Sequence, residues 1–138
     1  MSKYFNIKEL TASSIAIDKG IDNEPPMEIK LKLNKFITKC LDPLREACGF
    51  PITITSGYRC YQLNKAVGGV STSQHTKGEA ADLVGRTNKE TRRIFEVAKE
   101  LNNHDQLLYE RNSKGSVWVH ISWKPEGNRH QTIDNYKG

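Results

Sequence analysis

Cysteine is scarce in this sequence, which has only Cys40, Cys48 and Cys60 among 138 residues. Their number is odd and no two of them form a C-x-x-C pair, so the sequence indicates neither a disulfide framework nor a zinc ribbon. Cys40 and Cys48 fall on an apolar helical face, and we expect both to be small core residues. This use of cysteine is typical of a protein made in a reducing compartment.

Long apolar runs are also missing. No stretch approaches the roughly 18 apolar residues expected of a membrane span, and residues 1–8 lack the apolar core of a secretory signal peptide. We therefore expect synthesis in the cytoplasm and no membrane association.

Charges of one sign do not form blocks, although 21 Lys and Arg against 16 Asp and Glu leave a net charge of +5. Such a surplus favours anionic surroundings, such as nucleic acid, anionic lipid or a bacterial wall, but it is equally compatible with a mildly basic surface. Because no aromatic-rich basic stripe or nucleic-acid reading motif is present, we do not expect nucleic acid to be a partner.

Repeats, low-complexity tracts and linkers are absent, so residues 1–138 predict one domain. Residues 1–26 are interpreted as an irregular N-terminal arm with a short helix near Ile7–Leu10, packed on that domain. Apolar residues three and four apart predict a long helix that begins near Met27. The pair Asp42-Pro43 should kink or restart this helix, and Gly49 should end it.

Strand and helix patterns mix along the rest of the chain. We expect strands at 51–55, 79–84, 106–111 and 116–123, and helices at 61–67 and 88–102. The turn-rich residues 112–115 indicate that the last two strands form a hairpin. Helices come first and antiparallel strands dominate later, which predicts a compact α+β domain with an antiparallel sheet flanked by helices.

Two segments far apart in the chain combine imidazole and carboxylate side chains. Residues 73–82 read SQHTKGEAAD and residues 118–122 read WVHIS. Asp82 lies inside an apolar strand, where a carboxylate is costly to bury unless it is paired or bound to a metal. Strand alternation puts His120 on the more polar face of its strand.

For either residue alone, a structural role is the better interpretation: a cap for Asp82, a hydrogen-bonded core histidine for His120. Taken together with His75, they favour one metal ion. A catalytic zinc takes three protein ligands with nitrogen and oxygen donors and leaves its fourth position to water.

The pattern S-x-H-x-x-G-x-A-x-D followed by W-x-H resembles the M15 family of zinc D-alanyl-D-alanine carboxypeptidases and their phage endolysin relatives. The resemblance covers nearly the whole chain, including LDPLR at 41–45, SGYR at 56–59 and LNxxVGG at 63–69. It implies the hedgehog/DD-peptidase fold and one catalytic Zn²⁺. By correspondence with the family's ligands, it also implies that His75, Asp82 and His120 bind this ion.

The same resemblance implies that Arg59 points into the cleft and binds a substrate carbonyl or carboxylate. A guanidinium suits this role because it is always charged and pairs bidentately; the alternative is a surface ion pair. Ser73 either hydrogen-bonds the substrate or steadies its loop, and Trp118 is expected to be a wall of the cleft. His104 and His130 have no partner pattern, and we expect both to be ordinary surface residues.

The general base is less directly indicated. Many relatives place an acid three residues before the last histidine ligand, where this chain has Val117, so the acid must come from the preceding strand. Register decides which one it is. Pairing of Arg111 with Val117 across a five-residue loop brings Glu110 onto the face of His120, whereas a four-residue loop brings Asp105 there.

The run D-x-x-x-Y-E before the histidine strand also resembles the zinc-bearing hedgehog signalling domain, whose glutamate occupies the base position. We therefore choose Glu110 as the base, with Asp105 as the fallback. The resulting prediction is a zinc metallopeptidase that hydrolyses peptidoglycan stem peptides. It would be a D-Ala-D-Ala carboxypeptidase or an L-alanyl-D-glutamate endopeptidase of the endolysin type.

Such an enzyme is expected to be a monomer that acts on the cell wall after release from the cytoplasm, as a phage lysin does, or as part of a virion. The alternative is a zinc-stabilised module that binds cell wall or protein without catalysis. A candidate acid and the intact Arg59 argue against that alternative.

Overall fold

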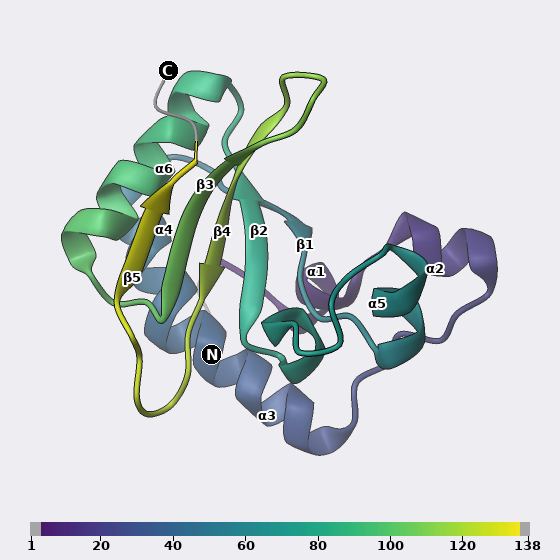
Figure 1. Ribbon diagram of the computed structural model, residues 1–138. Helices are drawn as coiled ribbons and strands as arrows, with labels where there is room; N and C mark the ends of the chain where they lie inside the picture. The colour runs from purple at the N-terminus through teal and green to yellow at the C-terminus, as the bar shows by residue number, and fades with distance from the viewer. Residues whose placement is uncertain (1–3, 136–138) are drawn as a thin grey trace.

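The computed structural model describes residues 4–135, which form a five-stranded mixed sheet with the longer helices packed on one face (Figure 1). Residues 1–3 of the predicted arm and 136–138 of the predicted domain lie outside the described part. The α-helices are α1 (Ile7–Thr11), α2 (Ser14–Lys19), α3 (Met27–Phe36), α4 (Asp42–Cys48), α5 (Tyr61–Ala66) and α6 (Asn88–Leu101). The strands are β1 (Thr53–Ser56), β2 (Ala80–Val84), β3 (Gln106–Arg111), β4 (Val117–Ser122) and β5 (Gln131–Asp134).

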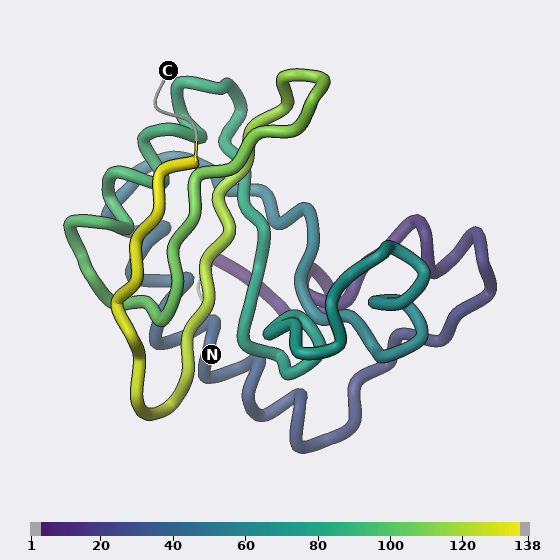
Figure 2. The backbone as a smooth tube through the Cα atoms, in the orientation of Figure 1, coloured from purple at the N-terminus to yellow at the C-terminus, as the bar shows by residue number. Residues whose placement is uncertain are grey.

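The strands lie in the order β1-β2-β4-β3-β5. All neighbours are antiparallel except β5, which runs parallel to β3 after the chain returns in a wide loop (Figure 2). The predicted antiparallel sheet flanked by helices is therefore confirmed for β1 to β4. The sequence analysis missed β5, whose presence makes the sheet mixed, and it also missed α2.

The long helix predicted from Met27 is confirmed, with the expected interruption at Asp42-Pro43. Between α3 and α4 the residues Ile37–Leu41 form a π-helical turn, in which the Asp42 N–H reaches back to the Ile37 carbonyl. Pro43 lacks an N–H and its ring crowds the preceding turn, so a regular α-helix cannot run through it. Gly49 ends α4 in the left-handed conformation, at φ 75°.

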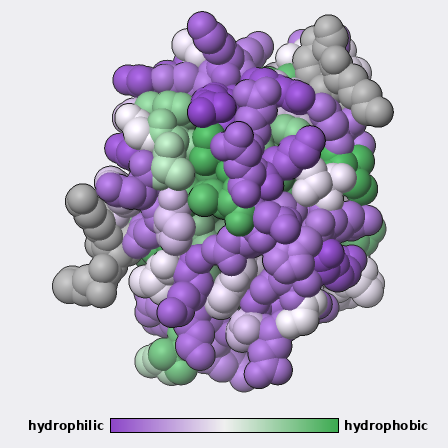
Figure 3. Space-filling view, turned by 90° about the vertical axis from the view of Figure 1, so that its left-hand side faces the viewer, coloured by the Kyte–Doolittle hydropathy of each residue, from purple (hydrophilic) through white to green (hydrophobic). Residues whose placement is uncertain are grey.

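Strand alternation divides the sheet into a buried face and an open face. Val117, Val119 and Ile121 of β4 are buried on the face covered by α6, and the intervening Trp118 and His120 are only partly buried. Helix α6 is strongly amphipathic. The side of the molecule that shows α6 and β5 is largely hydrophilic, with apolar residues confined to small areas (Figure 3). Because the apolar residues of β4 face α6, its more polar alternate residues lie on the open face of the sheet.

The N-terminal arm packs against the strand exit after β1. Leu10 of α1 is fully buried, and its carbonyl accepts a hydrogen bond from the Tyr58 N–H at 2.6 Å. A Cβ atom at Gly57 would overlap this Leu10 carbonyl, so only glycine allows the two backbones to approach so closely. The Asn23 side chain also joins the arm to this segment, through bonds to Tyr58 O and Cys60 N.

One expectation about the surface is wrong. His104 is fully buried and bonds Thr132 of β5 through Nε2 at 2.8 Å, because β5 covers it. His130 is exposed, as expected. Cys40 is buried and Cys48 packs against the core, which confirms the prediction for both. No helix among residues 4–135 has the length and apolarity needed to cross a membrane.

Candidate metal centre

Asp82 and His120 meet because β2 and β4 are neighbours in the sheet. The register pairs Asp82 directly with His120, and side chains that lie opposite each other on one face of a sheet are in contact range. The Asp82 Oδ1 lies 3.1 Å from the His120 Nδ1. Both side chains belong to the open face, away from α6.

His75 reaches the same point from a 3₁₀ turn, Gln74–Lys77, that precedes β2. The Ser73 hydroxyl accepts a hydrogen bond from the His75 N–H at 3.2 Å and so caps this turn. Gly78 ends it at φ 71°, in the left-handed region, and lets the chain turn into β2.

The three side chains form a tight cluster in which one donor atom from each lies within 4.8 Å of the others. The His75 Nε2 is 3.6 Å from the Asp82 Oδ1, and the two imidazole rings lie 5.2 Å apart with a tilt of 60°. Among residues 4–135 this is the group of His, Cys, Asp and Glu side chains arranged to hold an ion. The sequence prediction that these three residues converge is confirmed.

A backbone carbonyl orients His75. Its Nδ1 lies 2.7 Å from the Gly57 oxygen, and a carbonyl can only accept, so Nδ1 carries the proton. The His75 Nε2 therefore faces Asp82, and this is the nitrogen that can bind a cation when the imidazole is neutral. Support of this kind for a ligating histidine is a regular feature of zinc sites. The sequence analysis did not assign this role to Gly57.

The cluster also holds Asp82 in its charged form. Burial alone would raise the pKa of this carboxyl, but hydrogen bonds from His120 and His75 outweigh it and hold the pKa well below its usual range. An ionised carboxylate with two imidazoles is a borderline oxygen and nitrogen donor set, which fits zinc.

The cluster lies in a cleft of about 790 Å³ that Arg59, Ser73, Glu110 and Trp118 also line. The β-hairpin has the register predicted for a five-residue loop: Arg111 pairs with Val117, and Glu110 pairs with Trp118. The Trp118 Nε1 donates to the Glu110 Oε2 at 2.8 Å, which fixes this carboxylate on the face of His120. Trp118 thus lines the cleft, as predicted, and also orients Glu110.

Arg59 follows the strand exit after β1 and is tied to the metal-binding loop, because its N–H donates to the His75 carbonyl at 3.0 Å. Its side chain lines the same cleft. Burial lowers the pKa of the guanidinium, and the nearby Asp82 charge opposes that shift. The Arg59 Nε is buried without a hydrogen-bond partner among the described residues. Arg59 is therefore a half-buried cation that lines the cleft, as the resemblance implies, rather than the surface ion pair considered as the alternative.

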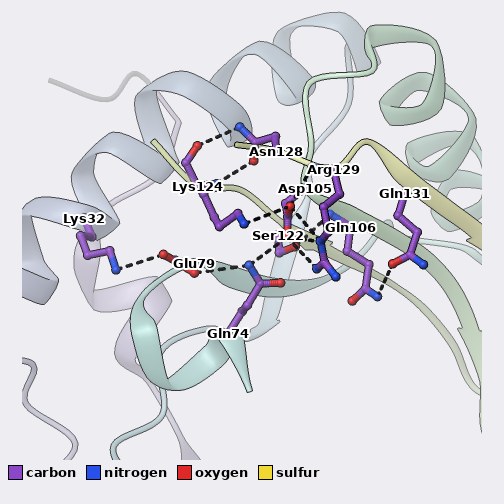
Figure 4. A network of polar contacts seen from close by, with 10 residues as sticks. All are labelled: Lys32, Gln74, Glu79, Asp105, Gln106, Ser122, Lys124, Asn128, Arg129 and Gln131. Atoms are coloured by element: carbon purple, nitrogen blue, oxygen red, sulfur yellow. Dashed lines mark hydrogen bonds and ion pairs between the residues drawn. The ribbon is translucent and has the colours of Figure 1, made fainter. Parts of the chain in front are cut away.

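Asp105 lies at the start of β3 and has a different environment. It is fully buried, and its carboxylate accepts hydrogen bonds from Arg129 and from Gln74 (Figure 4). Burial opposes ionisation, but these bonds and the charge of Lys124 hold its pKa well below the usual range. The sequence analysis left Gln74 unassigned and did not consider Lys124 or Arg129, since their meeting with Asp105 depends on the missed strand β5.

A comparison with known protein families agrees with this geometry. A search of curated proteins found no match to the chain. The family model described as Peptidase M15 matches residues 3–122, a range that contains the three residues of the cluster, Arg59 and Glu110. The chain belongs to the peptidase M15 family, a family of metallopeptidases.

Proposed function

We propose that this protein is a zinc-dependent peptidase that cleaves stem peptides of peptidoglycan. The observation that carries the proposal is the convergence, in one cleft, of a histidine–aspartate–histidine cluster with a carboxylate and a guanidinium. A cation that lines the cleft and an oriented acid beside a metal cluster are parts that hydrolysis needs and that a structural metal site does not. Membership of the M15 family supports a peptide as the substrate.

Each residue has one task in this proposal. His75, Asp82 and His120 would hold the zinc ion, which when bound polarises a carbonyl and lowers the pKa of water to about 7. Glu110, kept in place by Trp118, accepts the proton of the attacking water and later delivers it to the leaving amine. Arg59 binds the substrate carbonyl and stabilises the charge that develops on its oxygen. Ser73 caps the turn that carries His75.

Glu110 is favoured over Asp105 as the base because a single donor, Trp118, orients its carboxylate on the face of His120. Asp105 is fully buried, and several hydrogen bonds from Arg129 already use its oxygens. A carboxylate held in this way is poorly placed to exchange a proton with water.

The test compares zinc-loaded wild type with Glu110→Gln on purified peptidoglycan. Muropeptides are identified by mass spectrometry, which also reports whether a terminal D-alanine or an internal L-alanyl-D-glutamate bond is cut. Removal of a general base should lower kcat about 100- to 10,000-fold while bound zinc stays at one per chain. A variant with full activity would overturn the base assignment. A wild type that binds zinc and the wall but releases no peptide would favour a binding module instead.

A further inference from the structure

The cleft is not uniform, because one end of it is cationic. Lys124 and Arg129 line it beyond the metal cluster, and their side chains remain 34% and 53% exposed. Both face the buried Asp105, at 3.7 Å for the Lys124 Nζ and 2.7 Å for the Arg129 Nη2. Figure 4 shows the two side chains converging on this one carboxylate.

Charge at this end of the cleft is not balanced. The next carboxylate along the network, Glu79, is already paired with Lys32 of α3 at 3.0 Å and bonds Gln74. Among residues 4–135, Asp105 is therefore the carboxylate paired with both cations, and the network holds three positive groups against two negative ones. The uncompensated positive charge lies on the exposed, cleft-facing side chains of Lys124 and Arg129. A solvent-accessible cation pair of this kind attracts an anion.

The pair is also held rigidly. Arg129 bonds Asp105 through its backbone N–H, Nε and Nη2, so its guanidinium has a fixed orientation. The Asn128 side chain bonds both the N–H and the carbonyl of Lys124, at 2.8 Å each, and closes the loop between them. A pre-organised site loses less entropy when it binds a ligand.

The position of Asp105 relative to β3 indicates how far the cation pair lies from the metal cluster. The residue opposite His120 is Leu108, with Glu110 two residues toward one end of the strand and Asp105 three residues toward the other. At the strand rise, three residues span roughly 10 Å. An extended peptide covers the same distance in two to three residues. The pair therefore lies on the other side of the cluster from Glu110, within reach of a bound peptide.

We infer that Lys124 and Arg129 form a subsite that binds one carboxylate of the peptide substrate, about two to three residues from the scissile bond. The inference rests on the proposed peptidase function and adds a specificity determinant to it.

The test measures binding as well as turnover. The probes are a synthetic stem pentapeptide with all carboxylates free and a set in which each carboxylate in turn is a carboxamide. Dissociation constants are measured by calorimetry with zinc-loaded Glu110→Gln, and KM and kcat with the otherwise wild-type enzyme. The variant is Lys124→Gln, which leaves the Arg129–Asp105 bonds in place; the matched control is Lys114→Gln, an exposed lysine in the β3–β4 turn.

Lys124→Gln should raise the dissociation constant and KM of the free-acid peptide about 5- to 10-fold with kcat unchanged. One of the carboxamide peptides should bind the Glu110→Gln protein, in which Lys124 is intact, as weakly as the free-acid peptide binds the protein that also carries Lys124→Gln. Adding Lys124→Gln should not weaken the binding of that carboxamide peptide further. Lys114→Gln should change neither constant. Equal losses for the free acid and every carboxamide would overturn the inference. Since binding is measured without turnover, this result is distinct from failure of the proposed activity, in which wild type would bind the peptides but cut none.

Discussion

Asp82 and Asp105 are two carboxylates of one cleft, and both ionise more readily than an ordinary aspartate, for different reasons. Asp82 is stabilised by two imidazoles that are themselves potential metal ligands. Asp105 is stabilised by a guanidinium and an ammonium group, which cannot bind a cation. The first cluster can exchange its internal hydrogen bonds for bonds to a metal ion, whereas the second cannot bind a metal. Asp82 therefore belongs to a candidate metal site, and Asp105 to the cationic end of the cleft.

The largest effect is expected when the first cluster loses a ligand. His120→Ala leaves two donors, and we expect zinc affinity to fall more than 100-fold, so that the variant emerges from gel filtration without metal while wild type carries one zinc per chain. Metal content is measured by mass spectrometry. His130→Ala removes an exposed histidine outside the cluster and should keep the metal. Retention of stoichiometric zinc by His120→Ala would show that the ion binds elsewhere.

The second cluster should matter for stability rather than for metal. Asp105→Asn leaves Arg129 and Lys124 without their buried counter-charge, and we expect a loss of about 3 kcal/mol in the free energy of unfolding. Urea denaturation of the metal-free proteins measures this loss. The matched substitution Asp82→Asn should cost less, because an imidazole, unlike a guanidinium, carries no permanent charge that would be left without a partner. The opposite order would contradict the distinction between the two carboxylates.

The same pair of proteins gives a pH readout. The pKa of Asp105 is depressed in the folded state, so its contribution is fully present above the ordinary carboxyl pKa of about 4 and is lost as the pH falls below it. The stability gap between wild type and Asp105→Asn should therefore narrow as the pH is lowered from about 5 to 3. A gap that stays constant would mean that Asp105 contributes through packing alone.

A smaller effect should follow from Gly57→Ala. The added methyl group meets the Leu10 backbone, and relief of this clash should cost about 1–2 kcal/mol in stability. It should also shift the carbonyl that orients His75 and weaken zinc binding about tenfold. Gly115→Ala, at a left-handed turn position with open space around it, is the control; it should lower stability without changing zinc affinity. Equal zinc affinity in the two variants would show that Gly57 does not contribute to zinc binding.

The metal cluster could be predicted from sequence because its signals are local. Asp82 interrupts an apolar strand, and the alternation of β4 assigns His120 to the polar face. Both interpretations hold even when the predicted strand ends are slightly wrong. The choice of Glu110 was conditional on loop length, and the observed pairing of Arg111 with Val117 agrees with the five-residue case. The interruption of the long helix was visible because Pro43 has a direct steric effect.

The cluster of Asp105, Lys124 and Arg129 could not be predicted, since its contacts join residues that are far apart in the sequence. Strand β5 has four residues with little apolar pattern, and its parallel pairing with β3 depends on the long connection of residues 123–130. Without β5, nothing in the sequence buries His104 or brings Arg129 to Asp105. The role of the Gly57 carbonyl was missed for a related reason. Every residue has a backbone carbonyl, so the residue type does not indicate which carbonyl accepts a hydrogen bond.

The central claim is that His75, Asp82 and His120 bind one zinc ion that keeps a position open to solvent. A crystal structure of the zinc-loaded protein, with anomalous data collected on both sides of the zinc absorption edge, tests it most directly. We expect one strong anomalous peak bonded to the His75 Nε2, an Asp82 oxygen and the His120 Nδ1, with water as the remaining ligand. A peak elsewhere, or an ion enclosed by four protein ligands, would contradict it.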